Sequence, residues 1–395
     1  MTVRIGVIGV GTMGGAHARF LAEGNVKGAR LAALCDTDDA RRETLSREFP
    51  GVPLYAAADE LLDADVCDAV VIATLHYFHP EIGIAALGKG LHVLTEKPIA
   101  VQCSRARALI DAAEKSGRTL AVMFNQRTTP IFQAARQLVQ SGVLGKPQRL
   151  DWIITNWFRT QAYYRSGGWR ATWRGEGGGV LMNQAPHQLD LWQWIFGMPS
   201  AIRAECRVAQ YHDIEVEDDA IILADYANGA TAFFRTTTGE GRGTNRLEIV
   251  GDCGKIVLEQ GVVKEQAVLK RWQYKESASE VCANSPVANA KIEWDYTEET
   301  FPKIENPHGM VLQNFVDHIQ SGAPLIAPGA EALNALEIAN AAYLSAWTDE
   351  KIALPTDEAR FDRLLEERKR TSVLHESTSS DTVGGYHERW QVSWT

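Results

Sequence analysis

Hydrophobic and polar positions follow two different rhythms along the chain, and the first rhythm covers about 125 residues. Short apolar runs without polar alternation, typical of strands buried on both faces, occupy residues 4–8, 30–35, 69–74, 92–95 and 120–124. Helical patterns lie between them, over about 13–24, 38–49, 79–88 and 103–116. Because neighbouring parallel strands need crossover connections, this alternation predicts an α/β domain with a doubly wound parallel sheet.

The second rhythm begins after about residue 145 and is typical of an antiparallel sheet. A strand pattern covers 148–158, and the runs 219–226 and 230–237 flank the turn signal Ala227-Asn228-Gly229. The runs 246–250 and 255–258 flank a second turn signal at 251–254. Helices are expected at about 308–320 and 330–347. We therefore expect a first domain over residues 1–125, an α+β domain over 126–355 and a C-terminal extension over 356–395, with a mobile tail at 376–386.

The composition is that of a globular protein with two or three domains. Of the 395 residues, 45% are hydrophobic and 23% charged, and no apolar run approaches the roughly 20 residues of a membrane span. The net charge of −10 would repel a nucleic acid backbone, so neither nucleic acid nor a membrane is expected as a partner. The six cysteines form no Cys-x-x-Cys motif, which argues against a metal site and favours the reducing cytoplasm.

The segment Gly9-Val-Gly-Thr-Met-Gly14 fits the G-x-G-x-x-G pattern of dinucleotide-binding loops. It follows the first predicted strand and opens the first predicted helix. In such a loop the first glycine permits a tight turn, the second lets the backbone approach a pyrophosphate, and the third lets helix and strand pack closely. The start of the helix adds N–H groups and the positive end of its dipole. The residues expected to bind the cofactor here are Gly9, Gly11, Thr12, Met13 and Gly14.

Asp36 lies 22 positions after Gly14, at the end of the second predicted strand. A carboxylate there can accept hydrogen bonds from both hydroxyls of an adenine ribose. It also repels a 2′-phosphate, which favours NAD over NADP. Arg41 and Arg42 lie nearby in sequence and weaken this preference, so NADP stays open. The alternative is an ordinary strand–turn–helix with a surface aspartate, and the agreement of three signals in order and spacing disfavours it.

Glu96-Lys97-Pro98 follows a predicted strand at its carboxyl end, where open α/β sheets bind ligands. Pro98 fixes its own φ and restricts the backbone of Lys97. A lone lysine in a loop is usually a surface residue, but the place of Lys97 at the nucleotide-binding edge favours a functional one.

A glycine-rich run at 177–179 leads to Asn183, His187 and Asp190, whose spacing would place all three on one face of a helix. Pro186 cannot stand inside a helix without a kink, so a helix that begins at Pro186 is the alternative. The competing interpretation of His187 is a buried structural histidine bonded to Asp190.

With these motifs the sequence resembles the glucose-fructose oxidoreductase, inositol dehydrogenase and rhizopine-catabolism (Gfo/Idh/MocA) oxidoreductases. The resemblance covers about residues 3–355 and also includes the segments Thr74-Leu-His-Tyr-Phe-His79-Pro and Phe124-Asn-Gln-Arg127. It implies a Rossmann domain, an α+β domain with a large and mostly antiparallel open sheet, and dimers or tetramers formed through that sheet. It also implies NAD(P)-dependent redox chemistry on a sugar or cyclitol and a cis peptide before Pro98.

The resemblance implies roles for individual residues. Lys97 matches the family's catalytic lysine and His187 its catalytic histidine. The segments near the nicotinamide give a second set of expected cofactor contacts: Thr74, His76, His79, Glu96, Lys97 and Asn125. Arg127 joins Lys97, Asn183 and His187 as an expected substrate contact. Many members carry Asp four residues before the histidine, whereas this chain has Asn183, which puts a Lys–Asp–His proton relay in question.

The expected chemistry follows from the side chains. Oxidation of a secondary alcohol removes a hydroxyl proton as hydride leaves the same carbon. A neutral imidazole at His187 can take that proton, and the Lys97 ammonium can stabilise the developing alkoxide. Asn183 cannot accept a proton at working pH, so we expect it only to orient the substrate.

Aromatic residues are concentrated between positions 152 and 194, where six of the eleven tryptophans lie with arginines interleaved. Such a set suits a ring with an apolar C–H face and a hydroxylated rim. Trp192 and Trp194 are expected in the core. The residues from this segment expected at the site are Tyr164, Trp169 and Arg170, together with the pair Trp173-Arg174. Residues 163–170 are interpreted as a mobile loop that closes over substrate.

The arginines leave an acidic sugar open as substrate, because they could bind a carboxylate or a phosphate. His308, at the start of a late helix, is a candidate substrate contact, but a helix-terminal surface histidine is the favoured interpretation of its position. Three other functions remain open: an NADPH-dependent ketosugar reductase, an NAD-assisted glycoside hydrolase, and a non-catalytic nucleotide sensor. A sensor would need neither Lys97 nor His187.

Overall fold

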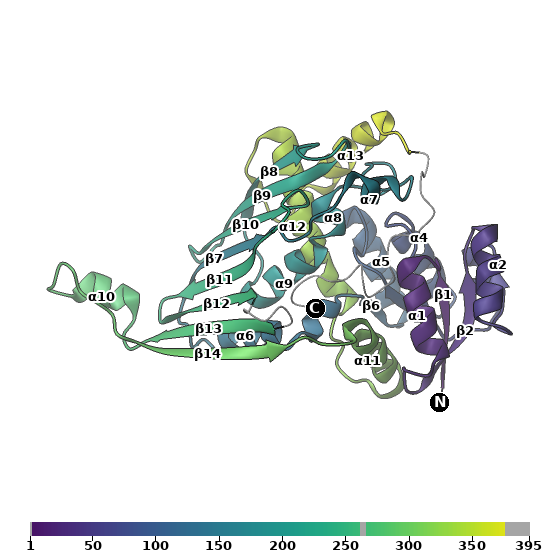
Figure 1. Ribbon diagram of the computed structural model, residues 1–395, viewed down its shortest axis with the longest axis horizontal. Coiled ribbons are helices and arrows are strands. Elements are labelled where there is room, and N and C mark those ends of the chain that lie inside the picture. Colours follow the sequence, from purple (N-terminus) through teal and green to yellow (C-terminus); the bar gives the residue numbers. More distant parts are fainter. Residues whose placement is uncertain (1, 261–265, 376–395) are drawn as a thin grey trace.

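Two β-sheets organise the chain in the computed structural model, which describes residues 2–260 and 266–375 (Figure 1). The expected tail at 376–386 lies outside these residues. The first sheet has six parallel strands in the order β3-β2-β1-β4-β5-β6. The strands are β1 (Val3–Ile8), β2 (Ala29–Cys35), β3 (Leu54–Tyr55), β4 (Ala69–Ile72), β5 (His92–Thr95) and β6 (Leu120–Val122). The helices between them are α1 (Thr12–Ala22), α2 (Asp39–Glu48), α3 (Ala58–Asp63), α4 (Phe78–Gly88) and α5 (Cys103–Ser116).

This sheet confirms the predicted doubly wound α/β fold. The predicted strands 69–74 and 120–124 extend two residues too far, because the chain leaves the sheet at Ile72 and Val122 to form loops. The sequence pattern missed β3 and α3, which are too short to show a period.

The second sheet has nine strands in the order β14-β13-β12-β11-β7-β10-β9-β8-β15. Among the described strand pairs, β7 and β10 run parallel and the others antiparallel, as expected for a mostly antiparallel sheet. The strands are β7 (Pro147–Ile154), β8 (Ala201–Val208), β9 (Glu217–Asp225), β10 (Thr231–Thr237), β11 (Asn245–Gly251), β12 (Gly254–Gln260), β13 (Gln266–Tyr274), β14 (Trp294–Pro302) and β15 (Ile352–Ala353).

Several helices of the C-terminal half pack against this sheet, and others reach back to the first one. The helices are η1 (Asn125–Thr128), α6 (Pro130–Gln140), α7 (Gln161–Arg165), α8 (Val180–Asn183), α9 (Pro186–Phe196), α10 (Ala278–Asn284), α11 (Pro307–Ser321), α12 (Gly329–Thr348) and α13 (Glu358–Thr371). The long helix α12 packs against α9 and β8, and α11 packs into the core of the parallel sheet. None of the helices in the described ranges has the length and apolar character to cross a membrane.

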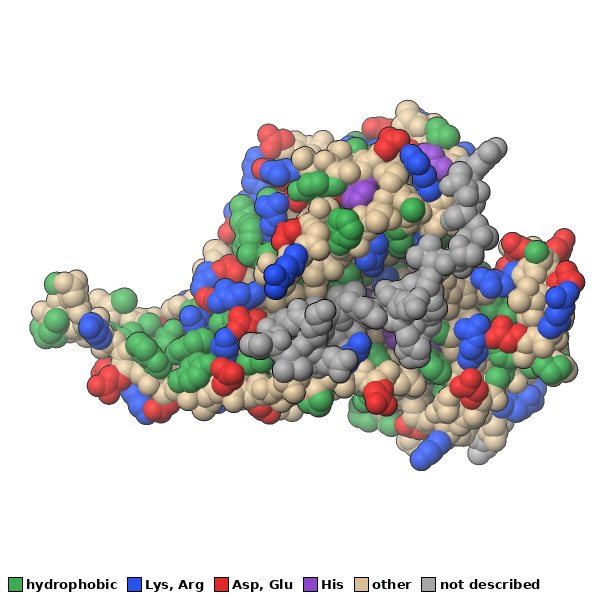
Figure 2. Space-filling view, viewed as in Figure 1, with side chains coloured by type: hydrophobic (Ala, Val, Ile, Leu, Met, Phe, Trp, Pro, Cys, Tyr) green, Lys and Arg blue, Asp and Glu red, His purple; other side chains and the backbone are tan. Residues whose placement is uncertain are grey.

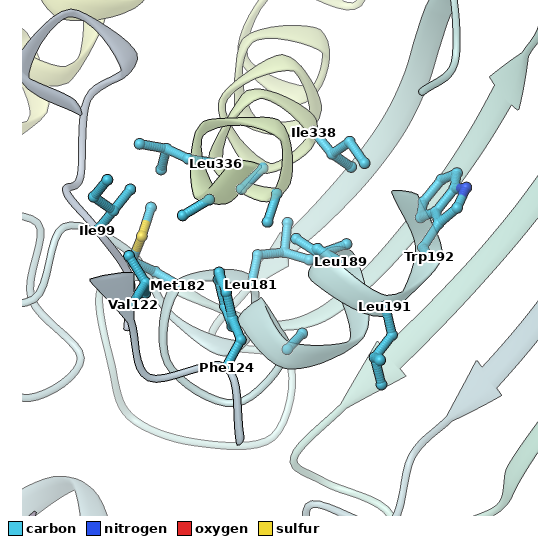
Figure 3. Close-up of a cluster of buried hydrophobic side chains, with 14 of the residues drawn as sticks. Ile99, Val122, Phe124, Leu181, Met182, Leu189, Leu191, Trp192, Leu336 and Ile338 are labelled. Atoms are coloured by element: carbon cyan, nitrogen blue, oxygen red, sulfur yellow. The ribbon is translucent and has the colours of Figure 1, made fainter. Parts of the chain in front are cut away.

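A buried hydrophobic cluster joins the two halves of the molecule (Figure 3). Ile99 and Phe124, from segments that follow β5 and β6, lie against Leu181 and Met182 of α8 and against Leu336 of α12. Each large apolar side chain buried in this way contributes about 1.5–3 kcal/mol. The carboxyl ends of the parallel strands are therefore held close to the start of α9.

Candidate active site

The glycine loop between β1 and α1 has the geometry of a dinucleotide cradle. Gly9 has a φ of +83°, which a residue with a side chain rarely adopts. A Cβ atom at Gly14 would stand 1.9 Å from the Gly9 carbonyl oxygen, whereas one at Gly11 would meet nothing within 4 Å. No side chain caps the start of α1. The loop thus presents open backbone and the positive end of a helix, as a pyrophosphate requires.

Asp36 lies directly after β2 and holds this loop in place. One carboxylate oxygen accepts a hydrogen bond from the backbone N–H of Val10 at 2.8 Å, and the other accepts from the N–H of Asp38 at 3.0 Å. The Arg42 side chain donates to the carbonyl oxygen of Asp36 at 2.6 Å and pairs with Asp39. A carboxylate and a guanidinium therefore lie side by side where an adenine ribose would bind.

The segment after β5 places Glu96 beneath Lys97. Glu96 is buried, and its Oε1 atom lies 2.8 Å from Nε2 of His17, which is fully buried on α1. Burial acts to raise the pKa of Glu96, but the hydrogen bond and charge of His17, together with the charges of His308 and Lys97, lower it to about 2. The sequence analysis did not identify His17. The signal that could have found it is a histidine three residues after the last glycine of the loop.

Lys97 points across the domain junction toward the glycine-rich run. Its Nζ atom donates to the backbone carbonyl of Asn183 at 2.7 Å. Burial lowers the pKa of the ammonium group, while the charges of Glu96 and Glu176 act to raise it. The peptide bond between Lys97 and Pro98 is cis, as the family resemblance implied.

His187 lies in the first turn of α9, buried, with its ring edge-on to Phe124 at 5.9 Å between centroids. Burial lowers the pKa of the imidazole well below its usual value, and the charges of Lys97 and His308 lower it further. Its Nδ1 atom has no hydrogen-bond partner among the residues that the structure describes. The structure thus brings Lys97 and His187 together, although they are far apart in the sequence.

The expectation that Asn183, His187 and Asp190 share one helical face is wrong. Helix α8 ends at Asn183 and α9 begins at Pro186, which is the alternative that Pro186 itself suggested. Asp190 contacts Arg127 and not His187. The proline breaks the helix because its ring and missing N–H do not fit a helix interior.

Arg127 lies elsewhere than expected for a substrate contact. Its side chain is 1% exposed and donates two hydrogen bonds to Asp190, at 2.7 and 2.6 Å. The remaining donor group binds the carbonyl of Ile326 and the carboxylate of Glu331. Because Asp190, Ile326 and Glu331 already accept hydrogen bonds from the guanidinium, Arg127 has a structural role.

The segments after β4 and β6 lie at the same edge of the sheet. His79 contacts the carbonyl oxygens of Pro98 and Thr74 through its two ring nitrogens, at 2.8 and 3.0 Å. Asn125 contacts Nδ1 of His308 at 3.4 Å through its amide nitrogen, and its Oδ1 atom is buried without a partner in the described chain. His308 is buried at the start of α11, so the favoured interpretation as a surface histidine is wrong.

The aromatic segment divides between site and core. The Trp169 ring packs edge-on against His76 at 6.0 Å, and the Arg170 guanidinium lies over it at 4.5 Å. Tyr164 is buried, and its hydroxyl lies 2.8 Å from Oγ1 of Thr238 of the sheet. Trp173 packs against Tyr343 and Trp347 of α12, so its expected place at the site is wrong.

Of the two tryptophans expected in the core, Trp192 is fully buried and stacks on Phe234. Trp194 is half-buried beneath the guanidinium groups of Arg127 and Arg136.

Glu176 is a buried acidic residue that the sequence analysis missed. It directly precedes the glycine run, and its carboxylate accepts hydrogen bonds from the side-chain amide of Asn183 and from the backbone N–H of Ala171. Nothing in its local sequence distinguishes it from a surface glutamate, because its burial depends on how the loop 166–176 folds.

Two family models match the chain. The one described as an oxidoreductase family with an NAD-binding Rossmann fold matches residues 3–124, and the GFO/IDH/MocA C-terminal domain matches residues 132–257.

Curated relatives and solved structures give the same result. The chain is 28% identical to inositol 2-dehydrogenase 2 of Saccharopolyspora erythraea over 65% of this chain and 74% of that protein. It is 26% identical to the rhizopine catabolism protein MocA of Rhizobium meliloti over 86% and 93%. The WlbA dehydrogenase of Chromobacterium violaceum, solved with NADH and UDP-GlcNAcA, superimposes with a TM-score of 0.76 at 26% identity, covering 90% of this chain and 97% of that one.

Proposed function

Since the chain belongs to the Gfo/Idh/MocA family of NAD(P)-binding oxidoreductases and is a dehydrogenase acting on CH–OH donors, we propose that it transfers a hydride between a secondary alcohol of a sugar, glycoside or cyclitol and NAD. The observation that carries this proposal is the convergence of Lys97 and His187. Lys97 follows β5 and binds the backbone carbonyl of Asn183, four residues before His187, and its charge acts on the His187 imidazole.

The residues present fit a dinucleotide. The open backbone at Gly11 and the uncapped start of α1 would hold the pyrophosphate, and Asp36 would hold the adenine ribose. Asn125, whose buried Oδ1 atom has no partner among the described residues, would accept a hydrogen bond from the amide end of the cofactor. When bound, the nicotinamide supplies the hydride acceptor. Thr74, His76, His79 and Glu96 would shape this end of the site through the loops that they hold.

Different side chains at the junction remove the proton and stabilise the developing charge. The neutral imidazole of His187, kept uncharged by burial and by Lys97, removes the hydroxyl proton. The Lys97 ammonium stabilises the developing alkoxide. Asn183 orients the substrate. Trp169 and Arg170 would contact the substrate ring, and His308 and Tyr164 are proposed as further contacts.

NAD is proposed as the preferred cofactor, because the Asp36 carboxylate would lie against a 2′-phosphate. Arg42 beside it is the feature that favours the alternative, NADP. Inositol dehydrogenases recur among the relatives, which supports a cyclitol or sugar substrate. An acidic sugar is the second candidate, because a groove of about 420 Å³ beside Trp169 has a net positive lining: Arg105, Arg174 and Lys369 against Glu81 and Glu366.

The test is the appearance of NADH across a panel of inositols, free hexoses, methyl glucosides and uronic acids. We expect turnover with one class, and turnover with uronic acids only would favour the acidic sugar. No NADH from any member would contradict the proposal. NADPH consumption with ketosugars, or release of free sugar without net NADH, would support the reductase or the glycosidase instead.

A further inference from the structure

The Glu176 carboxylate lies beneath Asn183 and beside Lys97, and the proposed function makes no use of it. Glu176 is 2% exposed. Its Oε2 atom accepts from the backbone N–H of Ala171 at 2.6 Å, and its Oε1 atom accepts from the Asn183 amide. Its backbone carbonyl accepts from Nδ1 of His76 at 2.9 Å. A buried carboxylate with these partners is fixed in position and cannot turn to solvent.

The charged and titratable groups that face Glu176 come from several elements. Lys97 and Arg170 act on it as positive charges, and the Tyr164 hydroxyl lies close enough to feel its charge. Burial raises the pKa of Glu176, while Arg170, the Ala171 N–H, the Asn183 amide and Lys97 lower it. In turn, Glu96 and Glu176 are the carboxylates that act to keep Lys97 protonated.

Glu96 is already committed to another partner. Its Oε1 atom is hydrogen-bonded to His17 at 2.8 Å, and that contact accounts for much of its low pKa. Glu96 remains the stronger of the two negative charges that raise the pKa of Lys97, and Glu176 adds to it against the positive charges of Arg170 and Arg159. A buried ammonium loses its proton readily without a nearby negative charge.

We propose that Glu176 is a positioning residue for the reaction: its carboxylate holds the Asn183 amide so that Asn183 Oδ1 faces the substrate, and it adds to Glu96 a second negative charge near the Lys97 ammonium, which the Asn183 backbone carbonyl binds. This inference rests on the proposed function, because Lys97 is assigned there as the group that stabilises the alkoxide. Asn183 donates its Nδ2 to Glu176, so its Oδ1 is the side-chain atom left to accept from a substrate hydroxyl.

The test measures the protonation of Lys97 without relying on turnover. Only the uncharged amine reacts in reductive methylation with formaldehyde, and peptide mass spectrometry reports the labelling of Lys97 as a function of pH. We expect the pH midpoint of labelling to move down in Glu176→Gln, because a stabilising negative charge is lost. Glu176→Asp, which keeps the charge one methylene further away, should give a midpoint between those of the wild type and Glu176→Gln.

Glu215→Gln is the matched control. Glu215 accepts from the backbone N–H of Trp173 at 2.7 Å, so it supports the same loop, but it is not among the charges that act on Lys97. We expect its midpoint to match the wild type. An unchanged midpoint in both Glu176 variants, or an equal shift in Glu215→Gln, would overturn the inference. If Glu176→Gln fails to fold by circular dichroism, Glu176→Asp against Glu215→Gln still decides it.

Kinetics provide the second readout. On the alkaline side of the pH profile, kcat/KM of Glu176→Gln should fall roughly tenfold below the wild type, while NADH affinity stays the same. Equal losses at all pH values would indicate a merely structural role and contradict the inference. Because labelling needs no substrate, an enzyme that oxidises no polyol but shows the shifted midpoint would refute the proposed function and leave the coupling of Glu176 to Lys97 intact.

Discussion

Asp36 has two tasks that a single carboxylate can combine. It fixes the glycine loop through the Val10 N–H, and it sets the charge that an adenine ribose meets. The positively charged guanidinium of Arg42 lies beside it and binds the carbonyl oxygen of Asp36 and the carboxylate of Asp39. Cofactor choice therefore depends on one negative charge placed against one positive charge.

We expect Asp36→Ser to raise the ratio of kcat/KM for NADP to that for NAD by roughly 10²-fold, because like-charge contacts cost several kcal/mol. The measurement is initial-rate kinetics with both cofactors. Asp38→Ser is the control: Asp38 caps α2 and should leave the ratio unchanged. A ratio that stays constant in Asp36→Ser would show that Asp36 does not select the cofactor.

Single residues were predictable where a motif carries them. The glycine loop, Asp36, Lys97 and His187 each stand in a recognisable pattern, and the structure gathers Lys97, His187, Asn125 and His308 at one junction. His17 and Glu176 escaped because their roles depend on burial and on contacts from distant segments. Arg127 was misjudged for the same reason, since its partner Asp190 lies 63 residues away.

At the scale of elements, Arg127 is a clamp between η1, α9 and the start of α12. Its two hydrogen bonds to Asp190 are buried, and its third nitrogen group donates to the carboxylate of Glu331 at the start of α12. The guanidinium also lies over the Trp194 ring at 5.3 Å. This clamp fixes α9, and with it His187, against the end of β6.

We expect Arg127→Met to lower the free energy of unfolding by about 3–5 kcal/mol, because Asp190 would be left buried without its counter-charge. Urea unfolding gives the value, and Arg136→Met, whose guanidinium covers Trp194 closer to the surface, should cost only about 1 kcal/mol. A stable Arg127→Met protein with a raised KM would restore the substrate role that the sequence suggested.

The elements themselves were predictable in the N-terminal half and less so in the C-terminal half. Buried strands such as β1 and β4 are continuous apolar runs, and a parallel sheet follows from them. By contrast, eight of the nine residues of β14 are exposed, and most of these are charged or polar, so the strand shows no buried hydrophobic face. Its pairing with β13 comes from backbone hydrogen bonds that sequence patterning does not report.

At the scale of the whole molecule, the helices that the structure describes leave one face of the nine-stranded sheet uncovered. Side chains that point away from the core on neighbouring strands include Ile153 of β7 and Leu223 of β9, which are 36% and 52% exposed. Phe233 of β10 pairs directly with Leu223. Figure 2 also shows hydrophobic side chains where β13 and β14 leave the body of the sheet toward α10, a region that includes Trp294 and Tyr296.

We expect the protein to form dimers or tetramers through this sheet face, because an exposed apolar patch on a sheet is stabilised when a second copy covers it. Light scattering after gel filtration gives the mass. Leu223→Asp should shift the population toward monomer, whereas Met310→Asp, an exposed substitution on α11, should not. A monomeric wild type, or equal masses for both variants and the wild type, would contradict this arrangement.

The central claim is that Lys97 and His187 act on the same proton and hydride transfer, and a double-mutant cycle tests it most directly. We predict that Lys97→Met and His187→Ala each lower kcat/KM by about 10²–10⁴ with the polyol that the panel identifies. Combined, they should cost little more than the worse single variant, because residues that act as a unit are not additive. NADH binding, measured by fluorescence, should be kept in all three proteins. Fully additive losses, or near-normal turnover in either single variant, would contradict the account.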